Sequence, residues 1–367
     1  MTVTGTSPLA TLREIAAAGA TAWPRLFPGS RPFGYFCSYW PEELVLSLGW
    51  EPLRLLPAAA TVVPARLPAQ SCFPAQACLA AAEAKEYDFL AGVGFAHTCD
   101  TSQCLAGIWP HRNALAFVGP VTLTAPGAIA YCTAELDHLW HRLARLAGAQ
   151  PDERELRRAI VLLNRIRSLA GRLDEMRGGL PSPLVAAVLR AGQLMPRAVY
   201  AAELEAAWPE LAAMADPDHG RFPLLISGSL VESDGLYTAL EELGARVVAD
   251  DTCTGYRHFA GLVDELAEPL AGLAGRLAAR IPCPCRHAHL EARPDYLLEL
   301  ARRRGARGAV LVTRKYCDPH TWDAVAVSEK LRLAGIPVLV LEMETVDPGG
   351  SERTRLQAFL ECLSDYD

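Results

Sequence analysis

The sequence predicts an α/β protein made of two doubly wound parallel-sheet domains joined by a helical connector. Three observations support this fold class. Short apolar runs alternate with helical stretches over residues 33–125, and the alternation resumes at Phe222. Between these regions, residues 133–215 are rich in Ala, Leu, Arg and Glu at helical spacing. The length of 367 residues exceeds one typical hydrophobic core and suits two domains of ordinary size.

Residues 1–132 are expected to form an N-terminal α/β domain that begins with a helical arm. Pro41 suits the first turn of a helix, because its missing N–H is not needed there. Glu42 and Glu43 follow it, where the helix dipole favours anions. The other expected elements are an alanine-rich helix over 1–30 and strands over 33–36, 51–56 and 88–96.

The helical connector is expected over residues 133–215, and a C-terminal α/β domain over residues 216–367. Strands separated by helices predict parallel sheets that are covered on both faces. In the connector, apolar residues recur at helical spacing, namely Leu156, Ile160, Leu163, Ile166 and Leu169. In the C-terminal domain, the expected strands cover 224–227, 246–249, 308–313 and 337–342, and the expected helices cover 235–243, 294–304, 321–334 and 352–363.

Composition and charge argue against several classes of function. A net charge of −7 and a pI near 5.8 argue against a nucleic-acid partner. No apolar stretch approaches the ~20 residues that span a bilayer, so no membrane partner is expected. The first residues lack the basic and apolar segments of a secretory signal. We therefore expect a cytoplasmic protein, in which disulfides are rare and the eleven cysteines are free for other roles.

Four of the cysteines occupy one architectural position, which is the most informative feature of the sequence. Each of Cys37, Cys99, Cys253 and Cys317 follows a short apolar run and precedes a helical pattern. In an open α/β sheet, ligands bind just beyond the carboxyl ends of the strands. Four soft thiolate donors from distant parts of the sequence therefore predict a soft metal or an iron–sulfur cluster in a cleft.

The remaining cysteines have weaker patterns. Cys283-Pro284-Cys285 stands near His287 and His289, but it lacks the two-to-four-residue gap of zinc fingers, so no metal is expected there. Burial in the core is the expected role of the four others, Cys78, Cys104, Cys132 and Cys362.

Several segments resemble one known family over nearly the whole chain. They are Phe36-Cys37-Ser38-Tyr39-Trp40-Pro41-Glu42-Glu43-Leu44, Cys99-Asp100, Asp250-Asp251-Thr252-Cys253-Thr254-Gly255-Tyr256-Arg257, Lys315-Tyr316-Cys317-Asp318-Pro319, residues 335–342 and the closing helix 353–360. In order and in element type they are similar to the 2-hydroxyacyl-CoA dehydratase and benzoyl-CoA reductase family. The resemblance implies two α/β domains with a cysteine-ligated 4Fe-4S cluster in the cleft between them.

The same resemblance implies an activity and partners. Members of this family remove water from 2-hydroxyacyl-CoA through a ketyl radical, or reduce an aromatic acyl-CoA ring. They work with a homologous second subunit and a separate ATP-hydrolysing activator that injects electrons. This chain has no Gly-x-x-x-x-Gly-Lys-Ser/Thr loop, in agreement with that division of labour. An acyl-CoA substrate and a second subunit or self-dimer are therefore the expected partners.

The resemblance also suggests which cysteines bind the cluster. Cys99 and Cys317 match the family pattern best, Cys72 resembles another recurring family cysteine, and Cys37 and Cys253 fall on family-like segments. One cubane takes at most four protein ligands, so five candidates exceed its needs unless the cofactor is larger. The sequence departs from many relatives at Thr101-Ser102-Gln103, where a basic residue is expected.

The leading hypothesis is an iron–sulfur subunit of a radical dehydratase or acyl-CoA reductase, which reduces an acyl-CoA thioester by one electron. One alternative is a homodimer with a double-cubane, eight-iron cluster that reduces small molecules. Another is a zinc-stabilised interaction protein with structural thiols. Glu42, His97 and His320 lie beside candidate ligands and are candidates for proton transfer, although each also suits a supporting or surface role.

Overall fold

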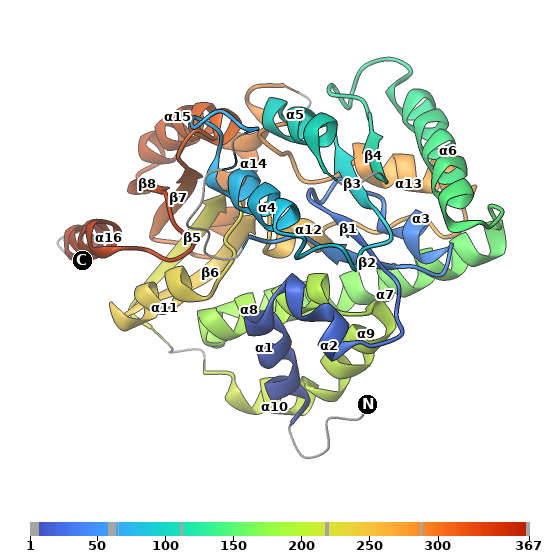
Figure 1. Cartoon of the computed structure of the whole chain (residues 1–367). Coiled ribbons are helices and arrows are strands. Elements are labelled where there is room, and N and C mark those ends of the chain that lie inside the picture. The colour runs from blue at the N-terminus through green and yellow to red at the C-terminus, as the bar shows by residue number, and fades with distance from the viewer. Residues whose placement is uncertain are drawn as a thin grey trace.

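Two four-stranded parallel sheets lie side by side, with helices around them (Figure 1). The structure is a computed structural model, and it describes residues 7–57, 64, 66–110, 113–216, 220–286 and 289–364. Every strand pair in both sheets is parallel. The predicted fold class, an α/β protein with two parallel-sheet domains, is therefore confirmed.

The first sheet has the strand order β2-β1-β3-β4. β2 lies on one side of β1 and β3 on the other, so the switch point of this sheet lies between β1 and β3. The strands are β1 (Pro32–Tyr35), β2 (Glu51–Arg54), β3 (Val93–Ala96) and β4 (Ala114–Phe117), and the helices between them are α3 (Glu42–Leu46), α4 (Phe73–Glu83) and α5 (Asp100–Ile108).

The loop after β1 is held on the sheet by aromatic packing. Trp40 stacks on Phe33 with ring centroids 5.8 Å apart, and Trp50 stacks on the same ring at 5.4 Å. The indole of Trp40 also lies over Gly94 of β3, where a Cβ atom would overlap the ring. Glycine at this position therefore lets the loop that carries Cys37 approach β3 closely.

The second sheet has the order β6-β5-β7-β8, and its switch point lies between β5 and β7. Its central strands are buried along almost their whole length, as expected for parallel strands covered on both faces. The strands are β5 (Phe222–Gly228), β6 (Ala245–Thr252), β7 (Gly308–Arg314) and β8 (Val338–Met343). The accompanying helices are α11 (Gly235–Glu242), α14 (Ala292–Arg303), α15 (Asp318–Leu333) and α16 (Gly350–Ser364).

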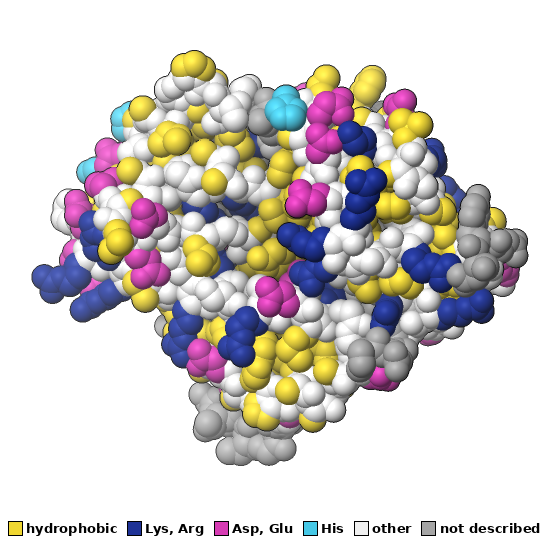
Figure 2. Space-filling view, turned by 180° about the vertical axis from the view of Figure 1, so that it is seen from behind, with side chains coloured by type: hydrophobic (Ala, Val, Ile, Leu, Met, Phe, Trp, Pro, Cys, Tyr) yellow, Lys and Arg dark blue, Asp and Glu magenta, His cyan; other side chains and the backbone are white. Residues whose placement is uncertain are grey.

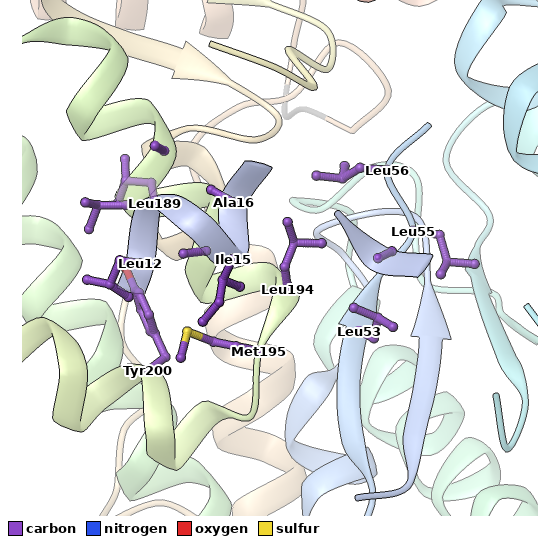
Figure 3. Close-up of a cluster of buried hydrophobic side chains, with 14 of the residues drawn as sticks. Leu12, Ile15, Ala16, Leu53, Leu55, Leu56, Leu189, Leu194, Met195 and Tyr200 are labelled. Carbon is purple, nitrogen blue, oxygen red and sulfur yellow. The ribbon is translucent and has the colours of Figure 1, made fainter. Parts of the chain in front are cut away.

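The chain between the last strand of the first sheet and the first strand of the second sheet is made of helices. The N-terminal helix α1 (Pro8–Ala18) packs against two of them, with Leu12 and Ile15 directed toward Leu189, Met195 and Tyr200 (Figure 3). The helices are α6 (Ala128–Ala147), α7 (Glu153–Met176), α8 (Ser182–Leu194), α9 (Arg197–Ala206) and α10 (Trp208–Met214), and the N-terminal arm adds α2 (Trp23–Leu26).

The chain between β6 and β7 returns to the first half of the molecule. After the short helix α12 (Tyr256–Phe259), helix α13 (Pro269–Ala278) packs against α6. Leu270, Leu273 and Leu277 of α13 join the apolar cluster that contains Trp40 and Trp50. This excursion brings residues 256–286 to the loops of the first sheet before the chain enters α14.

The outer surface carries mixed charge. On the face shown in Figure 2, basic and acidic side chains are interspersed with apolar ones rather than gathered into one patch of a single sign. Within the described residues, no helix is both long enough and apolar enough to cross a membrane.

Candidate metal centre

Seven cysteines gather where the loops after the strands of both sheets meet. Their sulfur atoms are near enough for their charges to interact when they ionise. All eleven cysteines of the chain are free thiols. The seven include all five predicted ligands, and Cys283 and Cys285 join them. The gathered cysteines are Cys37, Cys72, Cys99, Cys253, Cys283, Cys285 and Cys317.

Three of these thiols stand at the N-caps of helices, and we call them the N-cap set. Cys72 precedes α4, Cys99 precedes α5, and Cys317 precedes α15. Each of the three interacts with the other two. Free backbone amides and the helix dipole at an N-terminus stabilise a thiolate and so favour metal binding.

Burial opposes ionisation of the N-cap set while no metal is bound. It raises the pKa of Cys99 to about 12, against the effect of a hydrogen bond from the Ser102 amide. It also raises the pKa of Cys317 to about 12, against the corresponding bond from His320. These thiols are therefore neutral without a metal, and a metal that binds them must displace their protons.

The other four thiols form a second group, which we call the loop set: Cys37, Cys253, Cys283 and Cys285. Cys253 interacts with Cys37 and Cys283, and Cys285 interacts with Cys37 and Cys283. Cys99 connects the two sets, because it interacts with Cys37 and Cys283 as well as with Cys72.

Cys37 stands apart from the N-cap set, because a turn separates it from α3, which begins at Glu42. One expectation about the remaining cysteines was wrong. Cys104 and Cys362 are exposed rather than buried, since α5 and α16 each turn that face to solvent. Cys78 and Cys132 are buried, as expected.

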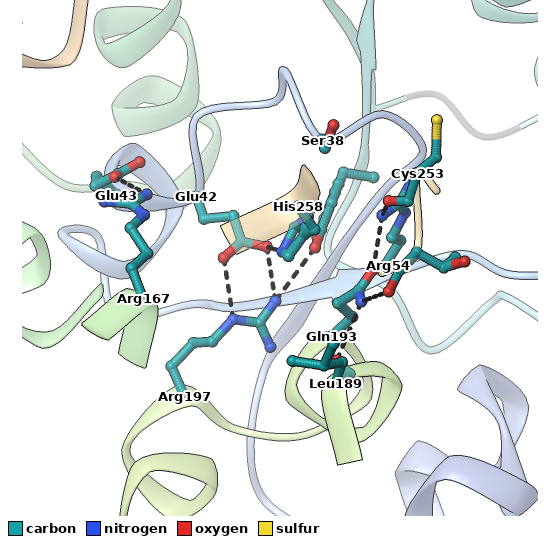
Figure 4. Close-up of polar contacts among 12 residues, drawn as sticks. Ser38, Glu42, Glu43, Arg54, Arg167, Leu189, Gln193, Arg197, Cys253 and His258 are labelled. Atoms are coloured by element: carbon teal, nitrogen blue, oxygen red, sulfur yellow. Dashed lines mark hydrogen bonds and ion pairs between the residues drawn. The ribbon is translucent and has the colours of Figure 1, made fainter. Parts of the chain in front are cut away.

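Buried arginines surround the thiols, and sequence reasoning missed them. Arg257 donates from Nη1 to the Cys253 sulfur at 3.3 Å and pairs with the Asp251 carboxylate. Arg54 donates to the carbonyl oxygens of Phe36 and Cys253, at 3.1 and 2.6 Å, and so connects the two sheets (Figure 4). Fully buried arginine is rare, so composition gives no signal for it. The only sequence signal for the contact between Arg257 and the Cys253 sulfur is their separation of four residues.

Glu42 belongs to a buried ion pair rather than to the thiol group. Arg197 binds its carboxylate through two contacts, Nε at 3.1 Å and Nη2 at 2.8 Å, and His258 Nε2 lies at 3.4 Å (Figure 4). Burial opposes ionisation, but Arg197 and His258 hold the pKa of Glu42 well below its usual range. The side chain is therefore a permanent anion that ties α3 to α9 and α12.

The two candidate histidines lie at the thiol group. His320 Nδ1 is 3.3 Å from the Cys317 sulfur, and burial lowers the pKa of His320 to about 3. Its imidazole is therefore neutral at physiological pH and can bond the sulfur from one ring nitrogen. His97 is half-buried, and its backbone oxygen accepts a hydrogen bond from Arg286 at 2.5 Å.

The donor type of this group, sulfur, is the type that iron–sulfur clusters take. Among the described residues, no three His, Cys, Asp or Glu side chains converge closely enough to hold one metal ion. The gathered donors are sulfurs, which suit iron–sulfur clusters, and the surrounding guanidinium groups suit a centre with net negative charge.

The family model for the 2-hydroxyglutaryl-CoA dehydratase D-component matches residues 37–363, which is most of the chain. The chain belongs to this family. The predicted resemblance is therefore confirmed. The region of this D-component chain that matches the family model contains all seven gathered cysteines.

Three characterised relatives are similar to the D-component chain. The (R)-phenyllactyl-CoA dehydratase beta subunit of Clostridium sporogenes is 24% identical, over 91% of this chain and 92% of its own length. A subunit of the benzoyl-CoA reductase of Thauera aromatica is 23% identical, over 89% of both chains. The (R)-2-hydroxyglutaryl-CoA dehydratase subunit beta of Acidaminococcus fermentans is 24% identical, over 50% of both chains.

Proposed function

We propose that this chain is the iron–sulfur subunit of a radical 2-hydroxyacyl-CoA dehydratase or of an aromatic acyl-CoA reductase. The observation that carries the proposal is the gathering of thiols from the strand ends of both sheets, in a chain of the D-component family. Relatives that align over about nine-tenths of the chain are subunits of a dehydratase and of a reductase by name.

In this proposal the N-cap set supplies the first three ligands, and Cys37 and Cys253 lie beside it. When bound, a 4Fe-4S cluster supplies single electrons, and an iron with an open position polarises a thioester carbonyl. The chain's own residues hold the thiolates in place. Helix N-termini stabilise Cys72, Cys99 and Cys317, while Arg257 donates to the Cys253 sulfur.

The ligand assignment is tested by iron analysis of the anaerobically purified chain. One cubane corresponds to about four iron and four sulfide per chain, with broad thiolate-to-iron absorption. Cys99→Ala and Cys317→Ala should each abolish that absorption. Cys132→Ala, which removes a buried thiol outside the centre, should leave it intact. A full iron complement in both of the first two variants contradicts the assignment.

A second candidate function is a self-sufficient homodimer with a double-cubane cluster. The observation that favours it is the number of gathered thiols, seven, against the four that one cubane requires. Iron analysis separates the two candidates, since a fused pair corresponds to about eight iron per chain. The zinc alternative predicts about one zinc and no iron per chain in the same analysis.

The proposed partners follow from the relatives and from the chemistry. All three relatives are named as single subunits of their enzymes, so we propose a homologous second subunit for this chain. We also propose a separate ATP-dependent electron donor and an acyl-CoA substrate.

A further inference from the structure

The Cys283-Pro284-Cys285 segment forms a closed turn at the centre of the thiol group. The Cys283 N–H donates to the Arg286 oxygen at 2.9 Å, and the Arg286 N–H donates back to the Cys283 oxygen at 3.0 Å. Cys283 is 6% exposed, and its thiol and that of Cys285 interact electrostatically. The turn therefore presents two sulfurs together.

Three buried arginines hold this turn against the loops that carry other cysteines. Arg280 donates to the Ser38 oxygen, next to Cys37, and to the Arg257 oxygen at 2.6 Å. Arg286 donates to the His97 oxygen at 2.5 Å, two residues before Cys99.

The third arginine connects the turn to the Cys253 loop. Arg293 donates to the Pro282 oxygen at 2.6 Å and to the Asp251 carboxylate at 3.0 Å, two residues before Cys253. The loops of Cys37, Cys99 and Cys253 thus each have an arginine anchor to the turn. Such fixed geometry is what a multi-ligand metal site requires.

The charges around the turn do not balance without a further anion. Of the five guanidinium groups there, Arg257 and Arg293 pair with the two carboxylates of Asp251 and Asp323. The other three bind neutral oxygens, and none forms an ion pair with a carboxylate of the described residues. They are Arg54, Arg280 and Arg286, which are 1%, 5% and 1% exposed.

Buried cations without a counter-charge are costly, so this excess calls for negative charge at the same place. Ligated thiolates supply it.

We infer that Cys283 and Cys285 are ligands of the iron–sulfur centre, together with Cys37 and Cys253 of the loop set. This inference rests on the second candidate function, the double-cubane centre, and deepens it, because it assigns the seven thiols to two sets that each hold iron. Each thiol that binds iron releases its proton to solvent.

The test compares the Cys283→Ser/Cys285→Ser double variant with Cys132→Ser, which replaces a buried cysteine of α6. All chains are reconstituted anaerobically with ferrous iron and sulfide, and iron, sulfide and the visible spectrum are measured. We expect the double variant to bind about half of the wild-type iron, because the N-cap set remains. Cys132→Ser should keep the full amount.

The outcomes separate this inference from the proposed function. A full iron complement and an unchanged spectrum in the double variant overturn the inference and leave the proposed function standing. No iron in the wild-type chain overturns both. A crystal structure of the iron-loaded wild-type chain decides the matter without a variant. An iron anomalous peak bonded to the Cys283 sulfur supports the inference, and peaks confined to the N-cap set contradict it.

Discussion

At the scale of single residues, buried ion pairs join distant segments of the chain. Glu42 and Arg197 bring α3 and α9 together, and His258 of α12 contacts the same carboxylate. Glu43, the next residue, pairs with Arg167 of α7 inside the protein. These pairs join segments that are far apart in sequence, and losing one partner leaves an uncompensated charge out of contact with water.

The first prediction concerns the Glu42–Arg197 pair. Arg197→Met should lower the free energy of unfolding by about 3–5 kcal/mol, because it leaves the Glu42 carboxylate buried and unpaired. Arg165→Met removes an exposed pair with Glu205 and should have little measurable effect. Adding Glu42→Gln to Arg197→Met should recover part of the loss. Urea denaturation measures all four chains, and equal losses in both arginine variants would contradict the prediction.

The second prediction concerns pH. Burial lowers the pKa of His258 from 6.5 to about 3, and the positive charges of Arg54 and Arg197 act in the same direction. The carboxylate of Glu42 acts in the opposite direction. Between these values the unfolded chain binds a proton that the folded chain does not. Stability is therefore complete above pH 6.5 and falls toward pH 3, by about 1.4 kcal/mol per pH unit for this group. His258→Gln should make the slope between about pH 6 and pH 4 shallower by about that amount.

The matched control for the pH experiment is His138→Gln. It replaces a histidine of α6 whose side chain is 72% exposed, and the wild-type slope should persist. Unfolding free energies at several pH values give both slopes. An unchanged slope in His258→Gln would show that the imidazole is protonated in the folded state.

At the scale of elements, helix N-termini position three of the candidate ligands. Cys72, Cys99 and Cys317 each take the N-cap place, and α4, α5 and α15 run away from the thiol group behind them. The sequence could predict this for Cys99 and Cys317, because an apolar strand pattern and a helical pattern meet at each of them.

The rest of the site could not be predicted from local patterns. The partners of Cys283 come from loops around Cys37, Cys99 and Cys253, so its place in the centre depends on contacts across the fold. The arginine anchors have the same origin: Arg280 and its acceptor Ser38 are separated by most of the chain. The spacing of Cys283 and Cys285 is shorter than the spacing in zinc fingers, and it carries no information about which distant loops lie beside them.

The third prediction concerns the packing of α1 on α8 and α9. Leu12 is fully buried there, so Leu12→Ala should lower the free energy of unfolding by about 2–5 kcal/mol. Leu266→Ala changes a leucine that is 96% exposed and should change stability by less than about 0.5 kcal/mol. Thermal and urea denaturation measure the difference. A small effect at Leu12 would mean that α1 contributes little to the core.

At the scale of the whole molecule, contacts between loops hold the two sheets in one arrangement around the thiols. Arg54, at the end of β2, reaches the Cys253 oxygen after β6, and also Gln193 of α8 at 2.7 Å. Each half of the molecule therefore contributes candidate ligands that the other half positions. The proposed centre cannot form in either half alone.

The fourth prediction concerns dependence on partners. The isolated, iron-loaded chain should not convert any 2-hydroxyacyl-CoA or aromatic acyl-CoA, because it contains no phosphate-binding loop to drive low-potential electron transfer. Activity should require an ATP-dependent activator, a strong reductant and a homologous second subunit. Turnover assays with each component omitted in turn measure this. Turnover by the lone chain with a nicotinamide donor and no ATP would contradict the mechanism.

The chain between β6 and β7 packs on the first half of the molecule, so the two halves cannot be separated without exposing apolar surface. A break after residue 215 would give a second polypeptide that carries α13 without the α6 surface that covers Leu270, Leu273 and Leu277. The first polypeptide would in turn expose Trp40 and Trp50. Recombination among relatives can therefore exchange whole chains, but a swapped half would have to bring its own matching helix surface with it.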